Sequence, residues 1–177
     1  LKNEAQGRPL YFLGYSFGAL MGAWAVQQYE SSPFEKLFLI APALESRWYA
    51  KAVLLIPGPD RWRIPSKNHP EYRVNGGTSL GAYRALYAIQ DQVRRADPKL
   101  LDLDVHAWIN PRDELVSPSR LAKKIQTSGW SHWKVDQIQA LEPSLRPVYQ
   151  HLFIDEASMG TKAWAALRDE LFKAATQ

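Results

Sequence analysis

Short apolar runs recur along the chain with the length and spacing of strands. Four are predicted as strands: Leu10 to Leu13, Lys36 to Pro42, Leu103 to Asn110 and Trp133 to Ile138. The first two are continuous apolar stretches, which is typical of strands buried in a parallel sheet. The last alternates apolar and polar positions, and we therefore predict it near a sheet edge.

Segments with apolar residues at helical spacing separate these runs. Four helices are predicted, over residues 17–29, 80–96, 117–126 and 161–175. Pro118 favours a helix start just after Ser117, because proline suits the first helical position. Strands that alternate with helices indicate the α/β class, with a mostly parallel sheet flanked by helices and right-handed crossovers.

Residues 43–80 break this alternation. The segment contains the Gly76-Gly77 pair and four prolines, Pro57, Pro59, Pro65 and Pro70. It also contains the aromatic residues Trp48, Tyr49, Trp62 and Tyr72. We interpret it as an irregular insertion in a single domain spanning 1–177, and not as a linker, because its aromatic side chains need a surface to pack against.

Composition excludes several classes of protein. The chain has 177 residues, enough for one domain with a substantial core, and a net charge of +4. Its 22 lysines and arginines are scattered and form no nucleic-acid-binding motif, so no nucleic acid partner is expected. Without cysteine there is no thiol nucleophile, disulfide or thiolate metal site. No apolar run approaches the roughly 18 residues that a membrane-spanning helix needs, so no integral membrane segment is expected.

The most specific motif is Gly14-Tyr15-Ser16-Phe17-Gly18, which joins the first predicted strand to the first predicted helix. A Gly-x-Ser-x-Gly sequence in this context predicts a nucleophile elbow, with the serine hydroxyl raised above the sheet. Strand and helix come so close there that side chains at Gly14 and Gly18 are expected to clash.

A serine nucleophile needs a base, usually histidine, and an acid that orients the base. Asp113 and Glu114 follow the third predicted strand in a short loop, and we favour Asp113 as the acid. A solvated turn aspartate remains the alternative for Asp113.

Of the four histidines, His151 follows the fourth strand and precedes the last helix, where the base should lie. The stretch from His151 to Asp155 can also be interpreted as a strand, in which case His151 would be structural. His106 lies within a predicted strand and is expected to be structural. His69 is expected to be exposed, and His132 to lie at the end of the sheet opposite the serine.

Three motifs together resemble those of the α/β-hydrolases: Gly14 to Gly18, Arg112 to Val116, and His151 to Asp155. The resemblance is to the branch of carboxylesterases, monoacylglycerol lipases and lysophospholipases. It implies a catalytic triad of Ser16, Asp113 and His151, with residues 43–80 corresponding to the variable cap. It also implies that the backbone N–H of Phe17 contributes to the oxyanion hole.

The chain departs from that pattern in two respects. Gln150 stands where many relatives have glycine before the catalytic histidine. Only nine residues precede the first strand, so the upstream strands and the second oxyanion donor that they supply are expected to be missing. The Leu10–Leu13 strand would then be an apolar sheet edge, and we hypothesise that an upstream segment or another chain, as in a homo-oligomer, covers it.

The resemblance implies a serine hydrolase that cleaves small-molecule carboxylic esters without metal or cofactor. Hydrolysis of thioesters or peptides and acyl transfer use the same triad, and a non-catalytic binding module or inactive fragment is the alternative from another class. A cap that bounds an apolar acyl pocket is expected from Trp48, Trp62, Ile64, Tyr72 and Leu80, although these side chains could instead simply pack onto the body. Four cations of the insertion either favour an anionic substrate or form a solvated face: Arg47, Lys51, Arg61 and Arg63.

Overall fold

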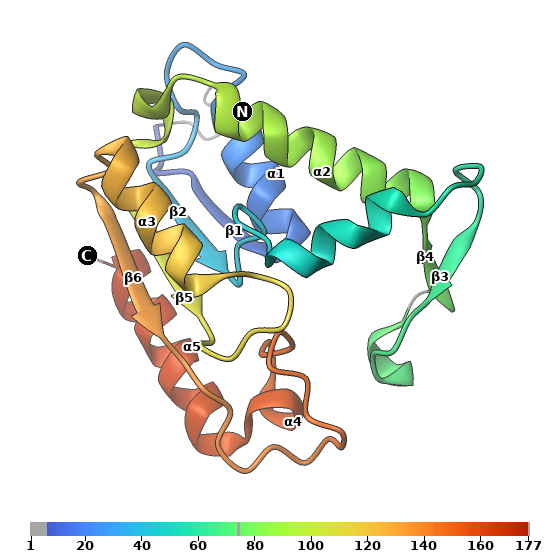
Figure 1. The fold of residues 1–177 in the computed structure, drawn as a ribbon. Helices are drawn as coiled ribbons and strands as arrows, with labels where there is room; N and C mark the ends of the chain where they lie inside the picture. The colour runs from blue at the N-terminus through green and yellow to red at the C-terminus, as the bar shows by residue number, and fades with distance from the viewer. Residues whose placement is uncertain (1–6, 74, 177) are drawn as a thin grey trace.

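A four-stranded parallel β-sheet forms the centre of the molecule (Figure 1). The computed structural model describes residues 7–73 and 75–176. The strands are β1 (Tyr11–Tyr15), β2 (Lys36–Ile40), β5 (Val105–Ile109) and β6 (Trp133–Gln137), in the spatial order β1-β2-β5-β6. All three pairings are parallel. The four predicted strands are confirmed, and β6 lies at an edge as expected.

Helices cover both faces of this sheet. One face packs against α1 (Phe17–Val26), α2 (Leu80–Arg95) and α3 (Pro118–Ser128), and the other against α5 (Thr161–Thr176). Shorter helical elements are η3 (Pro98–Leu101) and α4 (Glu156–Met159). The predicted α/β class, with helices flanking a parallel sheet, is therefore confirmed.

The alternation of side chains along β2 explains the two cores. Leu37 and Leu39 point into the cluster under α1, whereas Phe38 and Ile40 belong to the cluster under α5. Successive strand residues face opposite sides of a sheet, so a strand covered on both faces must be apolar throughout. The neighbouring strand β5 is buried along its entire length, including its polar residue His106.

The helix boundaries follow local chemistry, with two deviations from prediction. Ser117 accepts a hydrogen bond from the Arg120 backbone N–H and so caps α3, while Gly129 ends it in the left-handed conformation. Helix α1 stops at Val26, three residues earlier than predicted. Helix α3 ends at Ser128, two residues later than predicted. In α5, Leu167 is fully buried, whereas Phe172 is 65% exposed.

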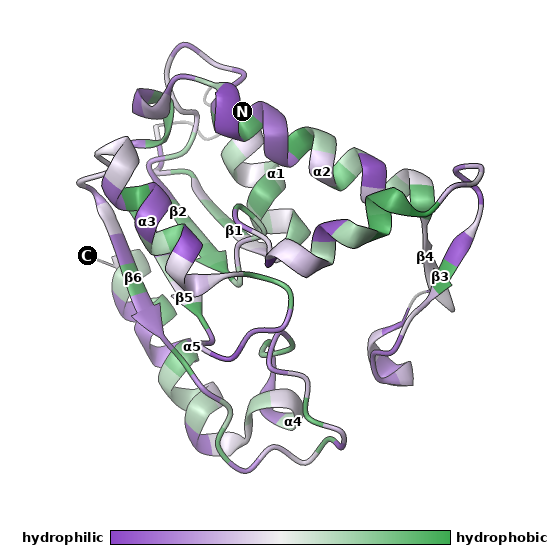
Figure 2. Cartoon of the chain, in the orientation of Figure 1, coloured by the Kyte–Doolittle hydropathy of each residue, from purple (hydrophilic) through white to green (hydrophobic). Residues whose placement is uncertain are grey.

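The segment between β2 and α2 is irregular, and its β3–β4 part extends away from the four-stranded sheet (Figure 1). It contains η1 (Trp48–Leu55), β3 (Arg63–Pro65), η2 (Pro70–Tyr72) and β4 (Gly77–Ser79). Strands β3 and β4 form a separate antiparallel pair, and η1 contacts α2. Figure 2 shows the second half of η1 as strongly hydrophobic. The expectation that the aromatic residues here are packed is wrong for Trp48 and Trp62, which are 80% and 54% exposed.

Strand β1 is the other edge of the sheet, because it pairs only with β2 among the described strands. Leu13, which lies on it, is 60% exposed. The hypothesis that a further segment or a second chain covers this edge stays a prediction. Within residues 7–73 and 75–176, no helix combines the length and the apolar character that crossing a bilayer requires.

Candidate active site

Ser16 occupies a sharp turn between β1 and α1. Its backbone has φ 53° and ψ −114°, a conformation that costs a non-glycine residue on the order of 1–3 kcal/mol. Three hydrogen bonds hold the turn: Ser16 N donates to the Ile40 carbonyl at 2.8 Å, and the Ser16 carbonyl accepts from Leu20 N at 3.3 Å and Ala43 N at 3.2 Å. The turn is therefore tied to the end of β2 and to the segment that follows it.

The two glycines of the motif differ in how closely they are surrounded. A Cβ atom added at Gly14 would lie 2.8 Å from the Ala19 backbone N and Cα atoms and 2.7 Å from the Phe12 ring. A Cβ at Gly18 would meet nothing within 4 Å. The steric argument therefore holds for Gly14, and the expectation of a clash at Gly18 is wrong, because the space around the Gly18 Cβ position is open.

Gly14→Ala should lower the free energy of unfolding by about 1–3 kcal/mol, because helix α1 must shift to admit the methyl group. Gly18→Ala is the matched control, and it should be neutral or stabilise by up to about 1 kcal/mol as alanine replaces glycine in a helix. Urea unfolding of both variants measures the difference. Equal stability of the two would contradict the close packing at Gly14.

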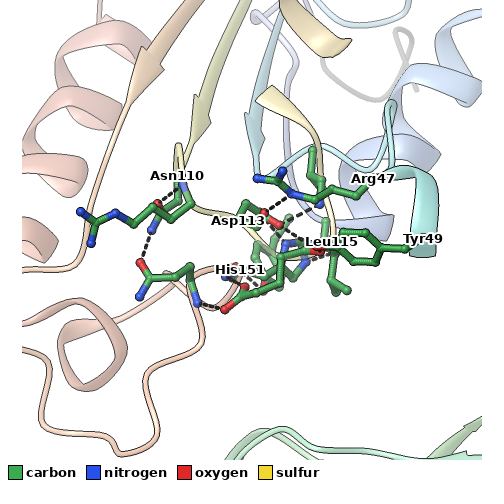
Figure 3. Close-up of polar contacts among 12 residues, drawn as sticks. Arg47, Tyr49, Asn110, Asp113, Leu115 and His151 are labelled. Atoms are coloured by element: carbon green, nitrogen blue, oxygen red, sulfur yellow. Dashed lines mark hydrogen bonds and ion pairs between the residues drawn. The ribbon is translucent and has the colours of Figure 1, made fainter. Parts of the chain in front are cut away.

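Asp113 lies in the loop that follows β5 and is completely buried. Its Oδ1 atom accepts hydrogen bonds from the backbone N–H groups of Leu115 at 2.7 Å and Val116 at 2.8 Å. These two bonds fix the carboxylate so that Oδ2 points toward His151, as Figure 3 shows. Asp113 is therefore a buried, internally bonded residue, and the alternative of a solvated turn aspartate is wrong.

His151 connects Asp113 to Ser16. Its Nδ1 atom lies 2.7 Å from Asp113 Oδ2, and its Nε2 atom lies 2.8 Å from Ser16 Oγ. Because a carboxylate only accepts, Nδ1 carries the proton and Nε2 can accept from the serine hydroxyl. The residues around His151 form turns, so the alternative interpretation of His151 to Asp155 as a strand is wrong.

Glu114, the competing acid candidate, does not contact the imidazole ring. Its two carboxylate oxygens accept hydrogen bonds from the backbone N–H groups of Gln150 and His151, each at 2.7 Å. Gln150 also accepts a hydrogen bond through its side chain from Asn110 Nδ2 at 3.0 Å (Figure 3). Gln150, which stands where the resemblance implies glycine, is thus held by two polar contacts.

Tyr15 contacts the same histidine from the β1 side. Its hydroxyl donates to the His151 carbonyl at 3.0 Å, and the two rings lie 5.5 Å apart. Burial raises the pKa of Tyr15 well above its ordinary value, and the charges of Asp113 and Glu114 act in the same direction. Tyr15 therefore remains a protonated donor. Neither the Tyr15 contact nor the two peptide contacts of Glu114 could be expected from the sequence, because both depend on where a distant loop returns.

Helix α1 begins at Phe17, directly after Ser16. No acceptor among the described residues bonds to the Phe17 N–H, which stands at the first helical position next to Ser16. The N-terminal N–H groups of a helix have no intrahelical partner and favour negative charge. A developing oxyanion near Ser16 could therefore accept from Phe17.

Two cavities meet at His151. The first, of about 430 Å³, contains Ser16 and is lined mainly by apolar side chains of η1 and α2, including Val53, Ile56 and Leu86. The second, of about 510 Å³, is lined by the β3–β4 region and more polar groups, including Lys67 and Asn68. His151, Leu115, Ile64 and Tyr83 line both cavities.

The residues expected to bound an apolar pocket only partly do so. Of the five, Ile64 lines both cavities, whereas Trp48, Trp62, Tyr72 and Leu80 line neither. Tyr72 instead donates to Asp155 at 2.6 Å, and burial together with this hydrogen bond raises the pKa of Tyr72 to about 12. Small and aliphatic residues of η1 take the place that the exposed tryptophans were expected to fill.

Two cations of the insertion have local structural partners. Arg47 Nε donates to the Asp113 carbonyl at 2.6 Å, and Lys51 lies 3.8 Å from Asp91. Tyr49 donates to the Glu114 carbonyl at 2.7 Å. The insertion is therefore bonded to the loop that carries both acid candidates (Figure 3).

The other histidines lie away from Ser16. His69 is buried, not exposed as expected, because its Nε2–H donates to the Pro147 carbonyl at 2.7 Å and its ring packs on Tyr149. His132 is exposed at the start of β6 and lies 3.2 Å from Asp102. His106 is buried and stacks on Trp108 at 3.8 Å, which fits the structural role expected of it.

His106, Asp136 and Glu170 form a cluster with metal-ligating atom types within 4.8 Å of one another. Burial lowers the pKa of His106 and Lys134 adds to this effect, against the influence of Asp136. Lys134 Nζ lies 2.8 Å from Asp136, and Trp108 donates to Glu170 at 2.8 Å. Protein donors already satisfy these carboxylates, so the cluster fits a polar network joining β5, β6 and α5 better than a cation site.

Comparison with known proteins supplies structural relatives. No protein-family model and no curated protein matches the sequence. Among solved structures, one from work on the metagenome-derived lipolytic enzymes LipS and LipT is 18% identical with a TM-score of 0.64, and the match covers 99% of this chain and 69% of that one. A soluble variant of monoglyceride lipase from Saccharomyces cerevisiae, solved with a substrate analogue, is 14% identical with a TM-score of 0.67 over 95% of this chain and 62% of its own.

A third similar structure is the monoacylglycerol lipase of Paleococcus ferrophilus, 12% identical with a TM-score of 0.65 over 95% of this chain and 70% of its own. The chain spans 62% to 70% of the length of these three proteins. At such low identity the likeness establishes the shared fold.

Proposed function

We propose that this chain, which has the α/β-hydrolase fold, is the catalytic part of a serine hydrolase that cleaves carboxylic esters. The observation that carries the proposal is the continuous hydrogen-bonded series from Asp113 through His151 to Ser16. Its three members come from loops at the carboxyl ends of different strands, and Ser16 opens onto a cavity. Such a series makes a serine hydroxyl nucleophilic at neutral pH.

In the proposed reaction, Ser16 Oγ attacks the ester carbonyl carbon while His151 Nε2 accepts its proton. Asp113 keeps the imidazole in the required tautomer and stabilises its charged form. The Phe17 N–H donates to the oxyanion that forms on the carbonyl oxygen. His151 then gives the proton to the leaving alcohol, and water hydrolyses the acyl-enzyme by the same steps. Gly14 allows α1 to approach β1, and Gly18 completes the motif at the start of α1.

An ester substrate with an apolar acyl group suits the surroundings of Ser16. The cavity that contains Ser16 is lined by aliphatic side chains, whereas the adjoining cavity offers more polar contacts. We assign the acyl chain to the first and the leaving group to the second. The similar structures described as lipases and esterases support ester hydrolysis over the other reactions of an acyl-enzyme.

Hydrolysis of p-nitrophenyl esters of increasing acyl length tests this assignment. Each buried methylene contributes about 0.8 kcal/mol, so kcat/KM should rise severalfold per carbon from acetate until the cavity is full. A matched thioester series and a peptide substrate should be hydrolysed more slowly. A flat profile in acyl length would contradict the apolar acyl site, and absence of turnover with every ester would favour a non-catalytic binding module.

A further inference from the structure

The segment that carries His151 has no regular secondary structure of its own. It extends from the end of β6 at Gln137 to the start of α4 at Glu156. A histidine in such a loop needs contacts from elsewhere to hold a position within a few tenths of an ångström. The contacts that fix its main chain therefore bear on how well Nε2 is aligned with Ser16.

Glu114 supplies two of these contacts at once. Its Oε1 and Oε2 atoms accept from the consecutive N–H groups of Gln150 and His151, each at 2.7 Å, although the residues are 36 and 37 positions apart in the chain. Hydrogen bonds to a charged acceptor are short and about twice as strong as neutral ones. This geometry uses both carboxylate oxygens and fixes the direction of the peptide plane before His151.

The opposite side of His151 is also held by a side chain. Tyr15 donates to the His151 carbonyl at 3.0 Å, so both main-chain polar groups of His151 bond to side chains. Tyr15 precedes Ser16 directly, and Glu114 follows Asp113 directly. Ser16 and Asp113 bond the His151 ring, and the residue next to each of them in the sequence bonds the His151 main chain.

Glu114 is itself well supported. Tyr49 donates to its carbonyl at 2.7 Å, and Asp113 Oδ1 accepts from the following N–H groups of Leu115 and Val116. The loop from Asp113 to Val116 therefore presents one carboxylate to the imidazole ring and the next to the main chain of the same histidine.

We propose that Glu114 is a positioning residue, whose carboxylate holds the His151 main chain so that Nε2 stays within hydrogen-bonding distance of Ser16 Oγ. This inference rests on the proposed function for its kinetic consequence. Without this contact all three catalytic side chains are still present, but the imidazole of His151 is free to move. The contact acts on the alignment of Nε2 with Ser16 Oγ, so its loss slows the chemical step, in which this alignment is required.

Glu114→Gln tests the proposal with minimal change in shape. The amide oxygen can accept from one N–H, but the amide nitrogen would face the other N–H, and two donors repel. Misplacement of a reacting group by about 1 Å costs up to about 10²-fold in rate, so kcat for ester hydrolysis should fall about 10–100-fold with KM unchanged. The rate at which an alkyl phosphonate modifies Ser16 should fall by the same factor. Glu30→Gln, at an exposed glutamate between α1 and β2, is the matched control and should change neither value.

A double-mutant cycle with Tyr15→Phe tests whether the two contacts act on one residue. If both hold His151, the double variant should lose less rate than the product of the two single losses, because the histidine is already free after the first. If the double variant loses as much rate as the product of the two single losses, Glu114 and Tyr15 act independently. That result would contradict the proposal that both residues hold His151 in position.

A readout that does not need activity separates this inference from the proposed function. His151 Nδ1–H donates a hydrogen bond to the buried Asp113 carboxylate, so its proton should give a downfield resonance in the ¹H NMR spectrum. This resonance should be present in the wild type and in Glu30→Gln. In Glu114→Gln it should broaden or shift upfield although the circular dichroism spectrum is unchanged. An unaltered resonance, or a change in KM alone, would overturn the positioning role. A wild-type protein that shows the resonance but no reaction with the phosphonate would instead contradict the proposed function.

Discussion

Ser16→Ala should reduce ester hydrolysis by about 10⁵–10⁶-fold, to the level left by binding and the oxyanion donor alone. The hydroxyl at 2.8 Å from His151 Nε2 is the only group in the proposed mechanism that can attack the substrate. Alanine removes this nucleophile without crowding the turn, although its backbone must keep the strained φ of 53°. Steady-state kinetics with p-nitrophenyl esters measures the loss, and circular dichroism verifies the fold.

Ser46→Ala is the control for this variant, because Ser46 is the second serine that lines the same cavity. Its hydroxyl accepts from Gln90 at 3.0 Å and has no contact with His151 in the described structure. Ser46→Ala should keep at least about a tenth of the activity. Equal losses from the two substitutions, or retained activity in Ser16→Ala, would contradict the assignment of Ser16 as nucleophile.

Asp113→Asn should lower kcat by about 10⁴-fold, because the carboxamide can replace only one of the two carboxylate oxygens as an acceptor. The effect on stability should be small. Its oxygen can continue to accept from Leu115 and Val116, which leaves the NH₂ group facing His151 Nδ1. The imidazole must then present a lone pair at Nδ1 and carry its proton at Nε2. In that tautomer it cannot accept the proton of Ser16.

Asp113→Ala separates the structural contribution from the chemical one. It removes the acceptor for two backbone N–H groups as well as the orienting group, and leaving buried donors without a partner costs about 1–3 kcal/mol each. We expect Asp113→Ala to lose activity comparably to Asp113→Asn but to unfold at lower urea concentration. An Asp113→Asn variant that retains a tenth or more of wild-type kcat would contradict the role given to Asp113.

The sheet could be predicted from the sequence because it depends on local patterns. Continuous apolar runs such as Lys36 to Ile40 are required of any strand with helices on both faces, and the structure has helices on both faces of β2. The order of motifs along the chain was equally informative. The Gly-x-Ser-x-Gly motif predicts Ser16, and Asp113 and His151 are predicted because each follows a later strand. The carboxyl ends of parallel strands lie along one edge of a sheet, so these side chains are expected to meet there.

What could not be predicted depends on the paths of loops. His69 is buried only because the segment before His151 returns beside it and supplies the Pro147 carbonyl. Trp48 and Trp62 are exposed, and within η1 the residues that line the cavity are Tyr49 and the small and aliphatic Ala50, Ala52 and Val53. The two peptide contacts of Glu114 likewise join loops 36 and 37 residues apart, and neither hydropathy nor spacing carries that information.

If Ser16, His151 and Asp113 act as one catalytic unit, an alkyl fluorophosphonate should react with Ser16, and peptide mass mapping locates the adduct. We expect a single adduct on the peptide that contains Ser16, absent from Ser16→Ala and formed far more slowly in His151→Ala and Asp113→Asn. A folded protein that forms no adduct, or an adduct on another residue, would show that these three residues are not a catalytic triad.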